Sequence, residues 1–162
     1  MLKIRKATEE DLPAITDIYN KAILTTTATF DTTVKTIKEQ RRWFRAHKKQ
    51  NPLLVAELDG TMVGWGSLSQ WSDRCAYADT AELSVYVAER HRGKGVGREI
   101  MKRLLFEGKK NGLHVVLSRI AEGNQGSIHL HESLGFFHVG VMKEVGVKFG
   151  RLLDVFLMEK IL

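Results

Sequence analysis

Two periodicities alternate along the chain, and together they predict its secondary structure. Apolar residues at three- and four-residue spacing, such as Leu12, Ile15, Ile18 and Ile23, indicate amphipathic helices. Short apolar or alternating runs indicate strands. We therefore predict helices over about 12–23, 37–48, 95–111 and 125–134. We predict strands over about 2–6, 53–58, 62–70, 78–87, 115–121, 136–147 and 152–161.

The order of these elements predicts an α/β fold with a mixed sheet, because strands and helices do not alternate regularly as in a doubly wound sheet. Turn residues support the boundaries. Pro13 stands near the start of the first helix, where proline is tolerated. Asp59-Gly60 is typical of a hairpin between two strands. The threonine-rich segment 25–33 breaks the helical pattern and predicts a loop or a distorted helix end.

Length and composition indicate an ordinary globular protein. The 162 residues are 43% hydrophobic and 27% charged, so we expect one domain over 1–162 with a full core. Cys75 is the only cysteine, which excludes an intramolecular disulfide, and no zinc site is indicated. The segment 1–5 lacks the apolar core of a signal peptide, and no apolar run reaches membrane-spanning length. We therefore expect a cytoplasmic location.

The net charge of +6 is compatible with nucleic acid, an acidic membrane or an anionic small molecule as partner. The densest basic cluster runs from Arg90 to Lys94, beside three glycines. A polyanionic cofactor explains this cluster without nucleic acid. A nucleic-acid module remains an alternative, although the sequence lacks an evident recognition helix or aromatic platform.

A glycine-rich run separates the strand at 78–87 from the long helix that follows. Glycine lets the backbone approach an anion closely, and the free N–H groups and dipole of a helix start attract phosphate. The run is not a P-loop, because no Gly-Lys-Ser/Thr closes it, and its spacing differs from the dinucleotide-binding pattern. It predicts a phosphate site. The residues concerned are Arg92, Gly93, Lys94, Gly95, Val96, Gly97 and Arg98.

The Arg-x-x-Gly-x-Gly pattern, after the strand residues 82–87, resembles the acyl-CoA site of the GNAT N-acetyltransferase superfamily. Four segments resemble its phosphinothricin and methionine sulfoximine acetyltransferase branch: 27–30, 71–77, 81–87 and 130–136. The element order is similar over essentially the whole length. The resemblance implies the GNAT fold, with a mostly antiparallel central sheet and helices on both faces, and acetyl-CoA as cofactor.

The same resemblance implies that the backbone of Val85, Tyr86 and Val87 contacts the acetyl group and pantetheine arm. A splayed strand there would offer N–H groups to the thioester oxygen. Asn124 resembles the family asparagine that contacts the cofactor arm, although asparagine is also a good helix cap. Ser133 is a further candidate contact, or only a small residue packed on its helix.

Glu82 is the candidate general base, because the amine acceptor must lose a proton before it attacks. Its apolar neighbours in the strand would favour the neutral form of a carboxyl group. The alternative is a surface glutamate on an edge strand. His131 occupies the position where many GNAT enzymes have tyrosine, and an imidazole could donate a proton to the leaving thiolate, bind substrate or order water. A histidine packed on a helix face is the alternative, and His129 should point elsewhere.

The branch resemblance places the acceptor beside Phe30 as an apolar wall and beside the segment Arg74, Cys75, Ala76 and Tyr77. Arg74 could hold a carboxylate bidentately, or be a solvated loop residue. Two positions depart from the branch, which often has a basic residue at Ser72 and a histidine at Leu153. These departures put phosphinothricin specificity in doubt.

We therefore expect an N-acetyltransferase that acetylates the amino group of a small amino-acid-like acceptor by direct attack in a ternary complex, without a metal. An acetylated Cys75 intermediate is a less favoured route. The alternatives are a protein N-terminal or polyamine acetyltransferase and a non-catalytic acyl-CoA sensor. The resemblance also implies a homodimer.

Overall fold

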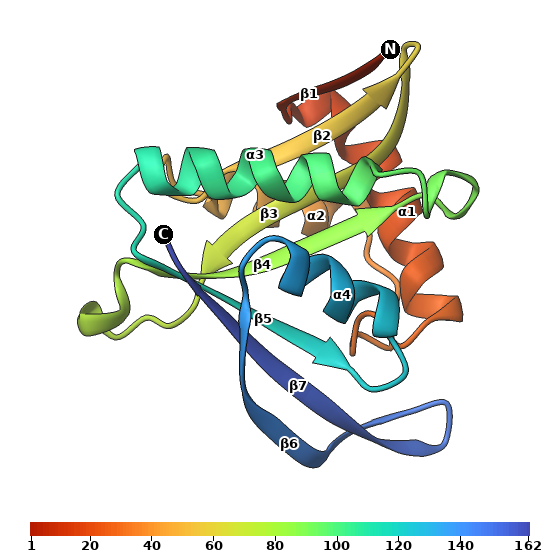
Figure 1. Cartoon of the computed structure of the whole chain (residues 1–162). Helices are drawn as coiled ribbons and strands as arrows, with labels where there is room; N and C mark the ends of the chain where they lie inside the picture. Colours follow the sequence, from red (N-terminus) through yellow and green to blue (C-terminus); the bar gives the residue numbers. More distant parts are fainter.

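The computed structural model describes residues 1–162, and its strands form one seven-stranded sheet in the order β1-β2-β3-β4-β5-β7-β6 (Figure 1). All neighbouring strands are antiparallel except β4 and β5, which are parallel. This confirms the predicted mixed, mostly antiparallel sheet. The strands are β1 Leu2–Lys6, β2 Leu53–Leu58, β3 Thr61–Gln70, β4 Thr80–Val87, β5 Val115–Ala121, β6 Phe137–Lys148 and β7 Arg151–Ile161.

Helices cover both faces of the sheet, as predicted (Figure 1). They are α1 Leu12–Thr25, α2 Ile37–Ala46, α3 Val96–Lys110 and α4 Gln125–Ser133. Alternate residues of β2 show the two faces, since side chains of a strand point alternately to either side. Leu54 and Ala56 join the larger core with α3, whereas Leu53 and Val55 pack with α1. No helix is long and apolar enough to cross a membrane.

Local turn chemistry explains most element boundaries. Asp59 and Gly60 both have positive φ, 50° and 82°, in the predicted hairpin turn between β2 and β3. Thr36 caps α2 by accepting a hydrogen bond from the backbone N–H of Glu39 at 3.2 Å. Three predicted boundaries were wrong by two residues or more. Helix α1 continues to Thr25, α2 already ends at Ala46, and β4 begins at Thr80 because the chain before it forms a short 3₁₀ turn over Cys75–Tyr77.

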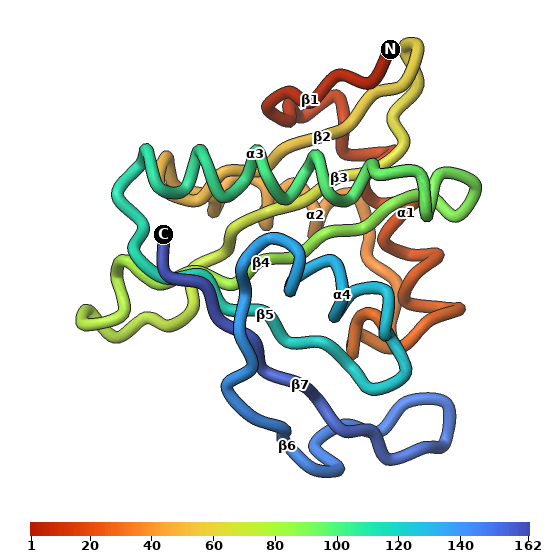
Figure 2. The backbone as a smooth tube through the Cα atoms, in the orientation of Figure 1, coloured from red at the N-terminus to blue at the C-terminus, as the bar shows by residue number.

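The pairing of β4 with β5 stops early, and this positions the functional site. The two strands pair only from Thr80 with Val115 to Glu82 with Leu117. Beyond Glu82 the strands separate, and β5 remains paired with β7 over its whole length. The backbone groups of 83–87 that face β5 therefore have no strand partner. The tube in Figure 2 shows how β4 and β5 diverge toward the start of α3 and the start of α4.

Candidate functional site

A groove of 890 Å³ lies where β4 and β5 separate, and the glycine-rich run forms part of its wall. The α1 end, the β5–α4 connection and the start of β7 supply the remaining walls. Gly93 and Gly95 line it with φ of 71° and 83°, a conformation that L-residues with a side chain rarely adopt. An added Cβ at either glycine would meet no atom within 4 Å, so the space in front of them is open.

The start of α3 supplies hydrogen-bond donors to this groove. The first backbone N–H bonded within the helix is that of Glu99, which donates to the Gly95 carbonyl at 3.1 Å. The N–H groups of Val96, Gly97 and Arg98 thus have no partner within the helix. Together with the positive end of the helix dipole, these N–H groups suit an anion, and an anion site here stays a prediction.

The residues predicted to bind the cofactor divide into those that line the groove and those that do not. Arg92 and Arg98 line the groove, and the Arg92 Nε donates to the Val87 carbonyl at 3.0 Å. Lys94 and the buried side chain of Val96 are not among its lining residues. Of the predicted arm-contacting residues, Val85, Tyr86 and Val87 all line the groove.

Ser133 and Asn124 have structural contacts that refine their predicted roles. Ser133 lies outside the groove, where its hydroxyl accepts from Arg98 Nη1 at 2.7 Å and thereby holds this arginine in place. Asn124 caps α4, because its Oδ1 accepts from the Ser127 N–H at 3.3 Å. Asn124 also lines the groove, so it both caps α4 and lies at a position suited to cofactor contact.

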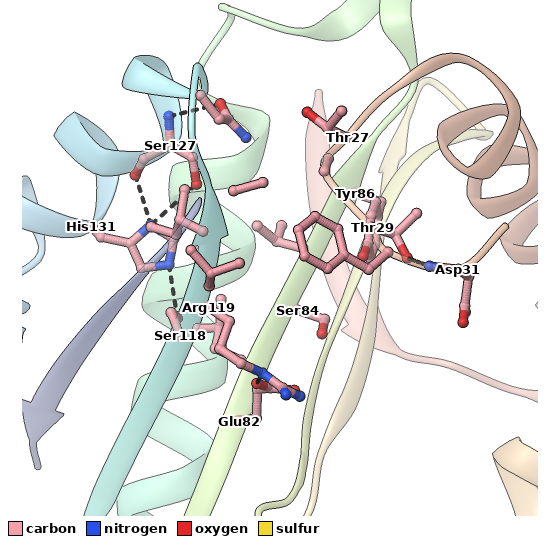
Figure 3. Close-up of a pocket in the computed structure, with 18 of the residues that line it drawn as sticks. Thr27, Thr29, Asp31, Glu82, Ser84, Tyr86, Ser118, Arg119, Ser127 and His131 are labelled. Carbon is pink, nitrogen blue, oxygen red and sulfur yellow. Dashed lines mark hydrogen bonds and ion pairs between the residues drawn. The ribbon is translucent and has the colours of Figure 1, made fainter. Parts of the chain in front are cut away.

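A second cavity of 560 Å³ adjoins the groove and shares six lining residues with it: Thr27, Ala28, Val85, Tyr86, Asn124 and Ser127. We call it the acceptor cavity. In Figure 3, β5 and α4 form one wall, with Ser118, Ser127 and His131. The segment 27–31 between α1 and α2 forms the opposite wall, and Glu82 lies with Arg119 at the side of β4.

Glu82 lies in the acceptor cavity but not in the apolar environment that the sequence suggested. Its carboxylate accepts from both Nε and Nη2 of Arg119, the second at 2.7 Å. This bond raises the pKa of the Arg119 guanidinium further, against the opposing effect of its burial. Arg119 in turn lies over the Trp71 ring at 5.5 Å. The cavity therefore contains a carboxylate with a fixed, charged partner.

His131 is buried at 3% exposure and lines the acceptor cavity. Its Nδ1 lies 2.7 Å from the Ser127 carbonyl oxygen, which can only accept, so Nδ1 carries the proton. Its Nε2 then accepts from the Ser118 hydroxyl at 2.9 Å. Burial lowers the pKa of His131 and so favours a neutral ring, and the backbone hydrogen bond to Ser127 opposes this effect. In this tautomer neither ring nitrogen has a free N–H that points into the cavity. A proton-donor role for His131 therefore remains a prediction, and it would require protonation of the second ring nitrogen as well.

His131 and His47 should make the fold acid-sensitive. Burial lowers the pKa of both, whereas histidine in the unfolded chain titrates near 6.5. Below that pH the unfolded chain binds more protons than the folded one, so the free energy of unfolding falls as the pH falls. Urea denaturation between about pH 5.5 and 7.5 should show this slope, reduced in His131→Gln. His129→Gln is the control, because the His129 side chain is 76% exposed. A slope that His131→Gln leaves unchanged would contradict the contribution of His131 to the acid sensitivity.

Phe30 lines the acceptor cavity, where the β6–β7 hairpin holds it, and its role beside the acceptor stays a prediction. A Cβ at Gly146 would lie 2.1 Å from its ring, so only glycine allows the ring to pack at this place. The adjacent Thr29 carbonyl accepts from the buried Lys148 Nζ at 2.7 Å. Burial lowers the pKa of Lys148, and Asp31 opposes this effect. The hairpin thus fixes the wall formed by 27–31.

The segment Arg74, Cys75, Ala76 and Tyr77 is exposed and contributes no lining to the groove or the acceptor cavity within this chain. Its role in acceptor binding therefore remains a prediction. Ser72 likewise lies outside both cavities, whereas Leu153 is buried and lines the groove instead of the acceptor cavity.

A family model described as an acetyltransferase (GNAT) domain matches residues 4–157. The chain belongs to the GNAT acetyltransferase family. The L-methionine sulfoximine/L-methionine sulfone acetyltransferase of Salmonella typhimurium is 40% identical over 159 residues, which are 98% of this chain and 93% of the relative. These findings confirm the resemblance to the branch and its fold.

Two solved structures are similar over nearly the full length. The phosphinothricin acetyltransferase of Sinorhizobium meliloti, in complex with acetyl-CoA, has a TM-score of 0.96 and 32% identity over 99% of this chain and 88% of that one. The ribosomal-protein-alanine N-acetyltransferase of Brucella melitensis has a TM-score of 0.96 and 41% identity over 99% of both chains.

Acetyl-CoA is the cofactor of this GNAT enzyme, and the groove fits it. The free N–H groups at the α3 start and Arg92 suit its diphosphate, and the unpaired β4 backbone suits an extended amide-containing arm. The sequence predictions missed Arg151, which lines this groove from β7, and also Ser118 and Arg119 in the acceptor cavity. Arg119 carried a signal, because it is the single charged residue in the apolar run 115–121.

Proposed function

We propose that this GNAT enzyme transfers the acetyl group of acetyl-CoA to the amino group of a small amino-acid-like acceptor. The observation that carries the proposal is the acceptor cavity itself. It is a 560 Å³ space with a paired carboxylate and several hydroxyl groups, and it opens onto the groove that fits the cofactor. The named activities of the Salmonella and Sinorhizobium relatives support the same class of acceptor.

Acetyl-CoA, when bound, supplies an acetyl group activated as a thioester. The amides at the start of α3 would hold its diphosphate, and the unpaired backbone of Val85 to Val87 would polarise the thioester carbonyl. Glu82 would attract the acceptor ammonium group and accept its proton. The Ser118 hydroxyl donates to His131, so its lone pairs remain for a hydrogen bond from the acceptor amine.

The proposal predicts acetyl-CoA-dependent thiol release with free amino acids and their sulfone or sulfoximine analogues. A panel of these acceptors, with N-terminal peptides and polyamines beside them, measures kcat/KM for each class. Turnover only on peptides would favour the alternative supported by the Brucella neighbour, a protein N-terminal acetyltransferase. Cofactor binding without turnover on any amine would indicate a sensor.

We also propose that the chain acts as a single domain in the cytoplasm and as a homodimer. The outer edge of β6 is unpaired, because β6 is the last strand of the sheet. Its exposed side chains include Phe137, Val139 and Val141, apolar residues suited to a partner. Light scattering should give twice the chain mass, and Val141→Lys should shift it toward the monomer.

A further inference from the structure

Arg119 is the one lysine or arginine in the lining of the acceptor cavity. The carboxylates of this lining belong to Glu82 and Asp31, and burial lowers the pKa of His131, which favours its neutral ring. An amino-acid acceptor brings both an ammonium and a carboxylate group into this space. Within this chain its carboxylate has a single cation to bind, because Arg74 contributes no lining.

The separation of β4 and β5 places Arg119 beside Glu82. Glu82 is the last residue of β4 that pairs with β5, where it lies opposite Leu117. Alternate residues of a strand point to the same face, so Arg119 leaves β5 on the face that Leu117 and Glu82 share. Figure 3 shows its guanidinium against the Glu82 carboxylate. Both charged groups therefore lie on one face of the sheet, where the strands separate.

The ion pair leaves part of the guanidinium free. Arginine has five N–H donors, and the Glu82 carboxylate accepts one from Nε and one from Nη2, the latter at 2.7 Å. Arg119 makes no other side-chain hydrogen bond within the chain, so both N–H groups of Nη1 and the second of Nη2 are unpaired. A second carboxylate can bind this Nη1–Nη2 edge bidentately while Glu82 keeps the Nε edge.

The guanidinium is held in place and still accessible. Its Cζ lies over the Trp71 ring, 5.5 Å from the ring centroid, and the ring attracts the cation. The Arg119 side chain is 54% exposed, whereas the Glu82 side chain is 20% exposed. A ligand in the acceptor cavity can therefore reach the arginine of this pair.

The Asp31 carboxylate on the opposite wall determines how an acceptor with both charges is oriented. Asp31 pairs with Lys35 at 3.5 Å, and Lys35 does not line the cavity. The cavity thus has a negative group at Asp31 and, across from it, the adjacent charges of Glu82 and Arg119. The acceptor carboxylate is favoured at Arg119. The ammonium group, which is bonded to the same carbon, then lies next to Glu82.

We propose that Arg119 binds the α-carboxylate of the acceptor and makes the enzyme specific for free amino acids over simple amines, amino-acid amides and the N-termini of peptides. This inference rests on the proposed function and adds the residue that recognises the carboxylate. In a peptide this carboxylate is replaced by an uncharged amide, so Arg119 loses its anionic partner. Loss of one charge-assisted, bidentate contact disfavours such acceptors by roughly ten- to hundredfold.

The test compares two acceptors that differ only at this carboxylate, L-methionine sulfone and its α-carboxamide. The kcat/KM of each variant is divided by that of the wild-type protein with the same acceptor, which cancels the different amine pKa values of the two compounds. Arg119→Gln should lower this ratio about ten- to hundredfold more for the amino acid than for the amide. Arg119→Lys keeps the charge but not the bidentate geometry, so its selective loss should be smaller.

This comparison separates carboxylate recognition from an effect on Glu82. Arg119→Gln also removes the partner of Glu82, and a resulting change in proton transfer would lower turnover of both acceptors alike. Equal losses for the amino acid and the amide would therefore overturn the proposal while the acetyltransferase function stands. A selective loss in Arg74→Gln that Arg119→Gln does not show would also overturn it, because Arg74 would then bind the carboxylate.

Arg103→Gln is the matched control. The Arg103 side chain is also 54% exposed, pairs with Glu107 at 2.7 Å and lies over the Phe106 ring at 5.5 Å. Arg103 belongs to α3 and lines neither the groove nor the acceptor cavity, so its replacement should change kcat/KM for both acceptors by less than about twofold.

A wild-type protein that acetylates no amine would contradict the proposed function, and binding then tests Arg119 separately. Isothermal calorimetry in the presence of coenzyme A measures the Kd of L-methionine sulfone and of its α-carboxamide. The amino acid should bind at least about tenfold more tightly than the amide, and Arg119→Gln should remove this difference. Equal affinities for the wild-type protein would overturn the carboxylate site.

Discussion

Replacement of Gly95 by glutamate is expected to abolish acetyl-CoA binding while the chain still folds. Gly95 has φ of 83° and stands at the start of α3, where the free amides form the proposed anion site. A carboxylate there would face the cofactor diphosphate. Two unit charges 4 Å apart repel by about 4 kcal/mol at an effective dielectric constant of 20, which corresponds to roughly a thousandfold loss of affinity. Isothermal calorimetry measures this loss directly.

Gly60→Glu is the matched control for backbone strain. Gly60 has φ of 82°, nothing within 4 Å of an added Cβ, and a place in the β2–β3 turn away from the groove. Both variants should lose stability by a similar amount, about 1–2 kcal/mol for a left-handed residue with a side chain. Only Gly95→Glu should lose affinity for acetyl-CoA. Unchanged acetyl-CoA affinity in a folded Gly95→Glu protein would refute the anion site at the start of α3.

Elements with strong local signals were predictable from the sequence. The strand over 115–121 and the hairpin turn at Asp59-Gly60 agree with the structure, because each is specified by adjacent residues. The predicted start of β4 was wrong for two reasons. The chain before Thr80 forms the 3₁₀ turn over Cys75–Tyr77, and Thr80 pairs with Val115, a residue 35 positions away, in a register that local patterning does not contain. Boundaries set by such long-range pairing could not be read from periodicity.

The two halves of the site differed in how well the sequence predicted them, for the same reason. The anion cradle is contiguous, so the run from Arg92 to Arg98 already specified a turn, a helix start and positive charge. The acceptor cavity instead assembles 27–31, β4, β5, α4 and the β6–β7 hairpin. Arg119 reaches Glu82 only because β4 and β5 are parallel neighbours, and the Ser118 contact with His131 depends on how α4 packs on β5. Residue patterns alone could not predict these contacts.

The Glu82→Gln variant is expected to lose about a hundredfold or more in kcat, within the range that general-base groups contribute. Glutamine keeps the size of the side chain and one oxygen acceptor, but it cannot take a proton from the acceptor ammonium. The loss should be larger at low pH, where more of the acceptor amine is protonated. The dissociation constant of acetyl-CoA should change by less than about twofold, because Glu82 lines the acceptor cavity and not the cofactor groove.

Glu57→Gln provides a matched comparison, since both glutamates are ion-paired with an arginine and similarly buried. The Glu57 side chain pairs with Arg5 and is 23% exposed, and the Glu82 side chain pairs with Arg119 and is 20% exposed. If the ion pair only stabilises the fold, the two variants should lose stability alike and keep turnover. If Glu82 accepts the proton, only Glu82→Gln loses kcat. A Glu82→Gln protein that instead loses acetyl-CoA affinity would show that Glu82 organises β4 and does not act on the acceptor.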